Sequence, residues 1–255
     1  MRINILLITI LFISGQGSCQ KDKVYLDLQE AMQSKDCVYV LKLNDQSLLE
    51  FPQQILEMPQ LFSLYLAGNL ITDIPEGIIK LQNLRMLDLS KNKLNSLPRN
   101  IGKLQNLLLL NASDNQLKEL PGTIWELKNL NTLDLTNNKL IHLPRIGDDA
   151  KQLQSLKISS NQLSRFPKTF FKLSGLKYLS SSENKLKKLP RKFGHLKELR
   201  LLDLSRNKLT KLPRSAKNMK RLMELDIRGN HFSEKKIENI KQCRSFRYVD
   251  IYHDL

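Results

Sequence analysis

The sequence predicts an α/β repeat fold, in which a curved solenoid carries a single parallel sheet on its concave face and short helical or 3-10 segments on its convex face. Asparagine recurs every 23 residues from Asn69 to Asn230. Proline recurs with the same step from Pro52 to Pro213, and this series takes up eight of the nine prolines in the chain. A fixed step of this length indicates stacked repeats, each of which buries its apolar side against its neighbours.

The segment 84–104 shows how one unit folds. It reads Leu-x-x-Leu-x-Leu-x-x-Asn-x-Leu-x-x-Leu-Pro-x-x-Ile-x-x-Leu. Leu87 and Leu89 alternate with polar residues, which predicts a strand with one buried face. After Asn92 the apolar residues lie three or four apart, which suits a turn followed by a short helical or 3-10 segment. Pro98 fixes φ at the corner, and the Asn92 amide can bond backbone groups of neighbouring coils.

This unit resembles the leucine-rich repeat. Its Leu-Pro-x-x-Ile-x-x-Leu tail is similar to the 23-residue class found in many bacterial repeat proteins and in a Ras-signalling-related group of plants and animals. The resemblance covers nearly all of the chain after its leader. It implies a leucine-rich-repeat solenoid, an architecture whose concave surface commonly binds partners.

Residues 1–18 are predicted to be a signal peptide. Met1-Arg2 is followed by an apolar stretch of eleven residues, 3–13, and then by small residues. A membrane-spanning helix needs about 20 apolar residues, so this stretch is too short to be a good anchor. We expect an exported protein that is secreted or periplasmic, or held at the outer membrane or cell surface as a lipoprotein.

Two ways of processing the leader remain open. Gly17-Ser18-Cys19 resembles the end of a bacterial lipobox, which implies that Cys19 carries a lipid anchor, although Gln16 departs from the aliphatic residue usual there. The segment 19–22, Cys-Gln-Lys-Asp, is similar to a signal that sends some lipoproteins to the cell surface. Cleavage after Gly17 or Ser18 would instead release a soluble protein.

The ends of the solenoid are predicted to be capped. Residues 19–37 form a tether and a cap helix over 26–32. Nine repeats occupy residues 38–245, and the ninth carries a short helix that begins with an N-cap at Ser233. Residues 246–255 form a capping strand written Phe246-x-x-Val249-x-Ile251. Atypical end units shield the last apolar layers of a solenoid.

The concave face is the predicted partner-binding surface. Side chains between the strand leucines point into it, and several are apolar or aromatic without being needed for the core, as is typical of protein-binding surfaces. Beside them runs an interrupted column of aspartates, for which a role in the repeat itself is the alternative. The predicted site for a protein partner comprises Met86, Asp88, Leu109, Asp134, Tyr178, Leu201, Asp203, Asp226 and Tyr248.

Charge supports an alternative function. Residues 1–150 hold 15 basic and 16 acidic residues, a balance of −1, whereas residues 151–255 hold 26 and 9, a balance of +17. A row of cations repeating from coil to coil can track a polyanion such as an acidic glycan, or can simply keep the surface solvated. Nucleic acid is the weakest candidate in an exported protein. The basic row comprises Arg145, Lys168, Lys185, Lys187, Lys188, Arg191, Lys208, Lys211 and Arg214.

No enzyme, metal or cofactor chemistry is expected. The four histidines do not pair with another His or Cys at metal-ligand spacing, and no stretch outside the repeats is long enough for a catalytic domain. No small-molecule substrate is predicted, and contact with a membrane is expected only through the N-terminal lipid.

Three cysteines are too few for a disulfide framework. Cys37 and Cys243 lie about 40 Å apart across the stacked strands, too far to pair, and are interpreted as cap residues.

Overall fold

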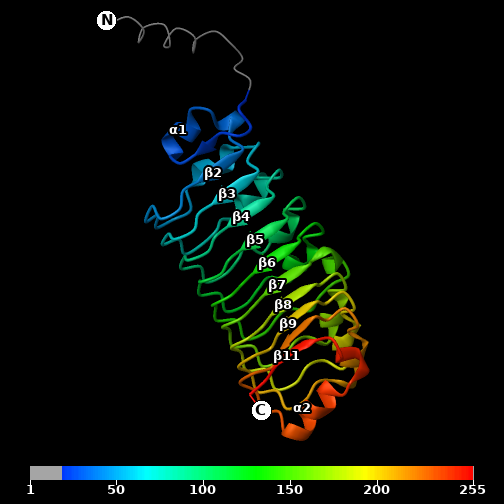
Figure 1. Ribbon diagram of the computed structural model, residues 1–255. Helices are drawn as coiled ribbons and strands as arrows, with labels where there is room; N and C mark the ends of the chain where they lie inside the picture. The colour runs from blue at the N-terminus through cyan, green and yellow to red at the C-terminus, as the bar shows by residue number, and fades with distance from the viewer. Residues whose placement is uncertain (1–18, 255) are drawn as a thin grey trace, which may run out of the picture.

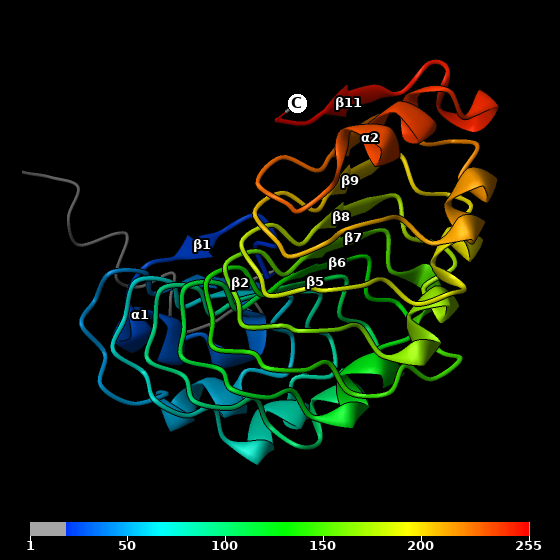
Figure 2. The same ribbon diagram turned by 90° about the horizontal axis from the view of Figure 1, so that it is seen from below.

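The computed structural model describes residues 19–254 and confirms the predicted solenoid. Eleven parallel strands form one open, curved sheet in which the strand order follows the chain. Figures 1 and 2 show the strands along the inside of the arc and the short helical segments along its outside. The strands are β1 (Val24–Tyr25), β2 (Val40–Lys42), β3 (Ser63–Tyr65), β4 (Met86–Asp88), β5 (Leu109–Asn111), β6 (Thr132–Asp134), β7 (Ser155–Lys157), β8 (Tyr178–Ser180), β9 (Leu201–Asp203), β10 (Glu224–Asp226) and β11 (Asp250–Tyr252).

The central residue of each repeat strand builds the core. Leu87 pairs in register with Leu110, and that leucine with Leu133, so apolar side chains stack from coil to coil. All three are fully buried. The residues on either side of each central leucine point to the concave surface, because successive side chains of a strand face opposite ways.

Short 3-10 helices form most of the outer layer. Proline directly precedes several of them, such as Pro121 before η5 and Pro167 before η7, because its fixed φ suits the corner and its missing N–H is not needed there. The bounds are η2 (Gln53–Glu57), η3 (Glu76–Lys80), η4 (Ile101–Lys103), η5 (Gly122–Glu126), η6 (Ala150–Gln152), η7 (Lys168–Lys172), η8 (Phe193–His195) and η9 (Arg214–Asn218).

The asparagine series has the structural role that the sequence predicts. The Asn161 amide donates to three backbone carbonyls, those of Leu135 (3.0 Å), Ile158 (3.1 Å) and Ser159 (3.1 Å). Its carbonyl oxygen accepts the N–H of Leu140 at 2.9 Å. One buried side chain therefore joins two consecutive coils and satisfies backbone groups that would otherwise lack partners.

The N-terminal cap contains a disulfide that the sequence analysis did not predict. Strand β1, helix α1 (Leu28–Met32) and the 3-10 turn η1 (Lys35–Cys37) lie against the first coil. Cys19 and Cys37 are joined within this cap, with Cα atoms 5.1 Å apart. Cys37 is thus a cap residue, as predicted, and its pairing with Cys19 is the part that the sequence did not predict. This disulfide and the predicted lipid anchor at Cys19 are alternatives, because one sulfur cannot form both a disulfide and a thioether.

The C-terminal cap differs from the prediction in register. Helix α2 (Glu234–Lys241) begins after Ser233 as expected, but the 3-10 turn η10 (Arg244–Phe246) follows it. Glu224 pairs with Asp250, a step of 26 residues instead of the predicted 24, so β11 starts at Asp250 and not at Phe246. The turn adds two residues between helix and strand. Phe246, the last residue of η10, is buried in the core.

Candidate functional site: two hollows on the concave face

The larger hollow of the concave face lies at its C-terminal end. It has a volume of about 440 Å³ and extends over strands β7 to β11. Its walls combine aromatic, apolar, hydroxyl and charged side chains. They are Ser155, Lys157, Tyr178, Leu179, Ser180, Leu201, Leu202, Asp203, Glu224, Asp226, Arg228 and Tyr252.

Two tyrosines and a leucine give this hollow its apolar surface. Tyr178 on β8 and Tyr252 on β11 are 41% and 44% exposed, although both contribute to the wall. Leu201 lies on β9, the strand next to Tyr178. Tyr178 and Leu201, both predicted site residues, are paired neighbours in the sheet. Tyr252 was not predicted; it pairs with Asp226 and so occupies the aspartate column.

Tyr248, predicted as a member of the site, does not belong to it. It lies in the turn before β11 and is 86% exposed, and the residue in register with Glu224 is Asp250. The prediction failed because it placed the last strand two residues early. The pattern Val249-x-Ile251 fits strand alternation equally well in either register, and only the length of η10 decides between them.

Charges at this end are partly compensated. The Arg228 guanidinium donates to both carboxylate oxygens of Asp226, at 3.1 Å to Oδ1 and 2.5 Å to Oδ2, and this contact raises the pKa of Arg228. It also lies 5.3 Å from the centre of the Tyr252 ring. Lys157 pairs with Asp134 at 3.2 Å. Glu224 forms no ion pair within the part of the chain that the structure describes.

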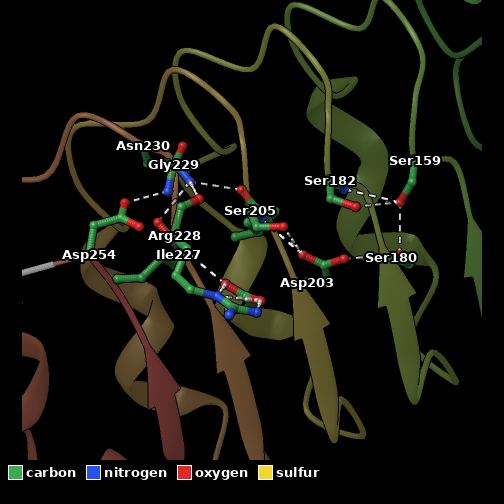
Figure 3. Close-up of polar contacts among 12 residues, drawn as sticks. Ser159, Ser180, Ser182, Asp203, Ser205, Ile227, Arg228, Gly229, Asn230 and Asp254 are labelled. Atoms are coloured by element: carbon green, nitrogen blue, oxygen red, sulfur yellow. Dashed lines mark hydrogen bonds and ion pairs between the residues drawn. The ribbon is translucent and has the colours of Figure 1, made fainter.

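A network of hydroxyl groups lies beside the larger hollow (Figure 3). Ser159 and Ser180 are joined through their hydroxyls at 2.8 Å, and Ser182 donates its hydroxyl to Ser159 at 2.9 Å. Ser180 donates to Asp203 at 3.3 Å, and Asp203 also accepts the N–H of Ser205 at 2.9 Å. These contacts fix the side chains that flank the hollow on β8 and β9.

The aspartate column has a role in the repeat itself. Asp88, Asp134, Asp203 and Asp226 each accept the backbone N–H two residues later, at 2.9–3.0 Å. Asn111 makes the same bond with Ser113 at 3.1 Å. One carboxylate oxygen of each aspartate therefore orders the turn after its strand. The second oxygen of Asp134, Asp203 and Asp226 contacts a neighbouring side chain, namely Lys157, Ser180 and Arg228 respectively.

A second hollow lies nearer the middle of the sheet. It has a volume of about 400 Å³ and is mainly apolar, with Leu108 40% exposed at its wall. The structure brings together here two predicted site residues, Met86 and Leu109. The lining is completed by Leu108, Asn129, Asn131, Thr132 and Gln152.

The nine residues of the predicted basic row are all exposed, and they do not line either hollow. Lys168 and Arg214 begin the outer helices η7 and η9. Within residues 19–254 none of the nine forms an ion pair, and Lys185 donates only to Gln162 at 3.3 Å. The row is therefore an accessible cationic surface separate from the concave face.

Within the described residues, no group of three or more His, Cys, Asp or Glu side chains is arranged to hold a metal ion. No helix of residues 19–254 is long and apolar enough to cross a membrane. Cys243, the cysteine outside the disulfide, is half-buried in the C-terminal cap.

A similar fold is found in a solved structure with a TM-score of 0.72, and a second solved structure matches this chain at a lower score. A leucine-rich-repeat protein of Leptospira interrogans is 23% identical, with a TM-score of 0.40 over 92% of this chain and 100% of that chain. A TDR receptor is 24% identical, with a TM-score of 0.72 over 87% of this chain and 40% of that chain. This chain thus spans less than half of the receptor. At these identities the likeness concerns the fold alone.

Sequence comparison identifies the family. No curated protein sequence matches this chain. The family profile described as leucine-rich repeat region matches residues 75–171. The profile described as leucine rich repeat matches residues 38–94, 151–209 and 190–232, together more than half of the chain. This chain therefore belongs to the leucine-rich-repeat family.

Proposed function

We propose that this protein is an exported, protein-binding scaffold whose partner occupies the concave face. Leucine-rich-repeat domains typically serve as interaction scaffolds and not as enzymes. The observation that carries the proposal is the larger hollow, where Tyr178, Leu201 and Tyr252 form an apolar surface among polar side chains.

These side chains are not needed to build the fold. The core is made by the central residue of each strand, such as Leu179 and Leu202, which are 2% and 1% exposed. Tyr178 and Leu201 flank these core positions and face outwards from the sheet. Exposed aromatic and apolar anchors within a polar rim are the features that dominate binding energy at protein interfaces.

Two features support export. The leader predicted over residues 1–18 has the pattern of a signal peptide. The Cys19–Cys37 disulfide is of a kind that persists in the periplasm or outside the cell and is rare in a reducing cytosol. Because this bond occupies the Cys19 sulfur, the form we propose is a soluble secreted or periplasmic protein.

Site-specific photo-cross-linking in the producing cells tests the proposed surface. A benzophenone amino acid would replace Leu201 in the larger hollow, and in a matched variant it would replace the exposed Lys217 of η9 on the convex side. We expect a discrete protein adduct from position 201 and none from position 217, because the partner covers the sheet. Equal adducts from both positions would contradict the proposal.

Binding through the basic row would give the opposite pattern of cross-linking. If the exposed cations were the binding surface, a probe at Lys188 would cross-link and a probe at Leu201 would not. The adduct would then be an acidic glycan or another polyanion, and its yield would fall steeply as the salt concentration rises.

A further inference from the structure

The acidic residues of the C-terminal half are not spread evenly over its surface. Residues 151–255 hold nine acidic residues against 26 basic ones. Five of the nine are found at the last three strands and the turn beside them: Asp203, Glu224, Asp226, Asp250 and Asp254. Figure 3 shows Asp203 and Asp254 on either side of Arg228. The concave end of a strongly cationic half is thus locally acidic.

The side chains that line the larger hollow also carry a net negative charge. It holds three carboxylates, Asp203, Glu224 and Asp226, against two cations, Lys157 and Arg228, a balance of −1. Both cations are already engaged, Arg228 with Asp226 and Lys157 with Asp134. Asp203 accepts only from serines, and Glu224 has no ion-pair partner within residues 19–254. Two carboxylates beside two tyrosines therefore remain available to a ligand.

The second hollow has a different chemistry. Met86, Leu108 and Leu109 form an apolar surface, and its lining contains no charged side chain. Thr132 and Ser155 are paired neighbours in the same concave column, and they line the adjoining edges of the second and the larger hollow. Their hydroxyls offer hydrogen bonds to a peptide backbone without blocking its path across β6 and β7.

We infer that the partner presents a linear peptide segment with one apolar anchor and one basic residue about six positions apart. This inference rests on the proposed function and specifies the partner of the same surface. Leu109 on β5 and Leu201 on β9 are separated by four strand steps. Adjacent strands lie about 4.8 Å apart, so the two hollows are about 19 Å apart along the solenoid. An extended chain advances about 3.3 Å per residue and covers this distance in about six residues.

The apolar anchor fills the hollow at Met86 and Leu109. The basic side chain enters the larger hollow, where its cation meets Asp203 and Glu224 and its methylene groups pack on Tyr178 and Leu201. The two carboxylates also disfavour acidic segments, because like charges brought together at an interface repel each other. The repulsion from the basic outer surface does not reach the hollow effectively, because charges farther apart than about 8 Å are largely screened at physiological ionic strength.

Selection from a phage-displayed library of random dodecapeptides on the purified protein tests this inference. The enriched peptides would be assayed on the wild type and on a double variant, Asp203→Asn with Glu224→Gln. Asparagine is tolerated at this column position, because Asn111 makes the same turn contacts there. The matched control is Glu234→Gln with Glu238→Gln on α2, which removes the same charge outside both hollows.

The expected result is a set of peptides with Lys or Arg about six residues from an apolar side chain. The double variant should bind them about tenfold more weakly, since each exposed carboxylate contributes up to about 1 kcal/mol. The α2 control should bind as the wild type does. Raising the salt concentration should weaken wild-type binding much more than binding to the double variant.

Leu201→Arg, assayed on the same peptides, separates the two proposals. Peptides that lose binding to Leu201→Arg but carry no basic residue, and that bind the double variant as tightly as the wild type, would overturn the inference and leave the proposed function standing. A library without any binder sensitive to Leu201→Arg would count against both.

Discussion

At the scale of the residue, the repeated asparagine is the side chain on which the coils most depend. Each one bonds backbone groups of two consecutive coils, and Asn161 makes four such contacts within a buried environment. Backbone groups left without partners in the interior cost about 1–3 kcal/mol each. The asparagine therefore determines stability through the groups that it satisfies and not through its own burial.

Replacing Asn161 by alanine should lower the free energy of unfolding by about 2–4 kcal/mol, because buried backbone groups lose their partners. Urea denaturation followed by circular dichroism measures this loss. Gln162→Ala provides the control, since that side chain is exposed and its one hydrogen bond within the described residues is with Lys185, while its backbone bond to Leu140 is retained in alanine. A loss of equal size for both variants would show that the asparagine contacts do not carry the stability.

Ser181 is expected to lower the stability of the fold. Its hydroxyl is fully buried without a hydrogen-bond partner, at a position where neighbouring coils place Ile158 and Leu204. Ser181→Ala should therefore stabilise the protein by about 1 kcal/mol, because the unsatisfied hydroxyl is removed. Ser159→Ala should have the opposite sign, because the Ser159 hydroxyl bonds Ser180 and Ser182. Thermal unfolding of the two variants side by side decides whether the signs differ as expected.

Single residues also show how far the sequence alone could predict the site. Tyr178, Leu201, Met86 and Leu109 follow from the period, because a fixed step places equivalent residues in one column. Tyr252 does not follow, since the period ends at the cap and its column depends on a turn of unpredicted length. The division into an acidic hollow and an apolar hollow also depends on side-chain packing that spacing does not encode.

At the scale of the element, the predictions made from the sequence differ from the structure mainly in the two caps. The interior coils were predictable because every unit repeats the same spacing, so each prediction was supported by its neighbours. The caps occur once each. The α2 helix was predictable from Ser233 and the residues after it, whereas η10 and the Cys19–Cys37 disulfide were not.

The disulfide should stabilise the N-terminal cap locally. It closes a loop between cysteines 18 residues apart, and loops of about this length gain about 3 kcal/mol from the link. Cys37→Ser should therefore speed amide hydrogen exchange in β1, α1 and β2, while coils beyond β4 remain unchanged because each repeat contacts only its neighbours. Cys243→Ser is the control, because Cys243 is free.

Hydrogen-exchange mass spectrometry gives the outcome coil by coil. Uniform acceleration of exchange throughout the sheet would show that the cap controls the stability of the whole solenoid, contrary to this expectation.

The intact mass of the exported protein tests whether the disulfide forms. A mass two hydrogens below the reduced chain, without added lipid, is expected if the Cys19–Cys37 bond forms during export.

At the scale of the whole molecule, the stack separates two surfaces by geometry. The concave sheet presents a continuous row of strand side chains, and the convex side presents turns with exposed cations. Because both surfaces repeat with the same step, a ligand that follows one of them contacts successive coils. The solenoid therefore suits extended partners, and the position of the two hollows favours the concave side.

Methyl-resolved NMR during titration with a selected peptide tests most directly whether the concave face is the binding surface. Labelled Met, Leu and Ile methyl groups report on both surfaces. We predict that shifts concentrate at Met86, Leu109 and Leu201 in the hollows. The methyls of Leu49 and Ile141, which are 69% and 57% exposed outside the hollows, should not move. Shifts confined to Leu49 and Ile141, with the hollow methyls unchanged, would contradict the account.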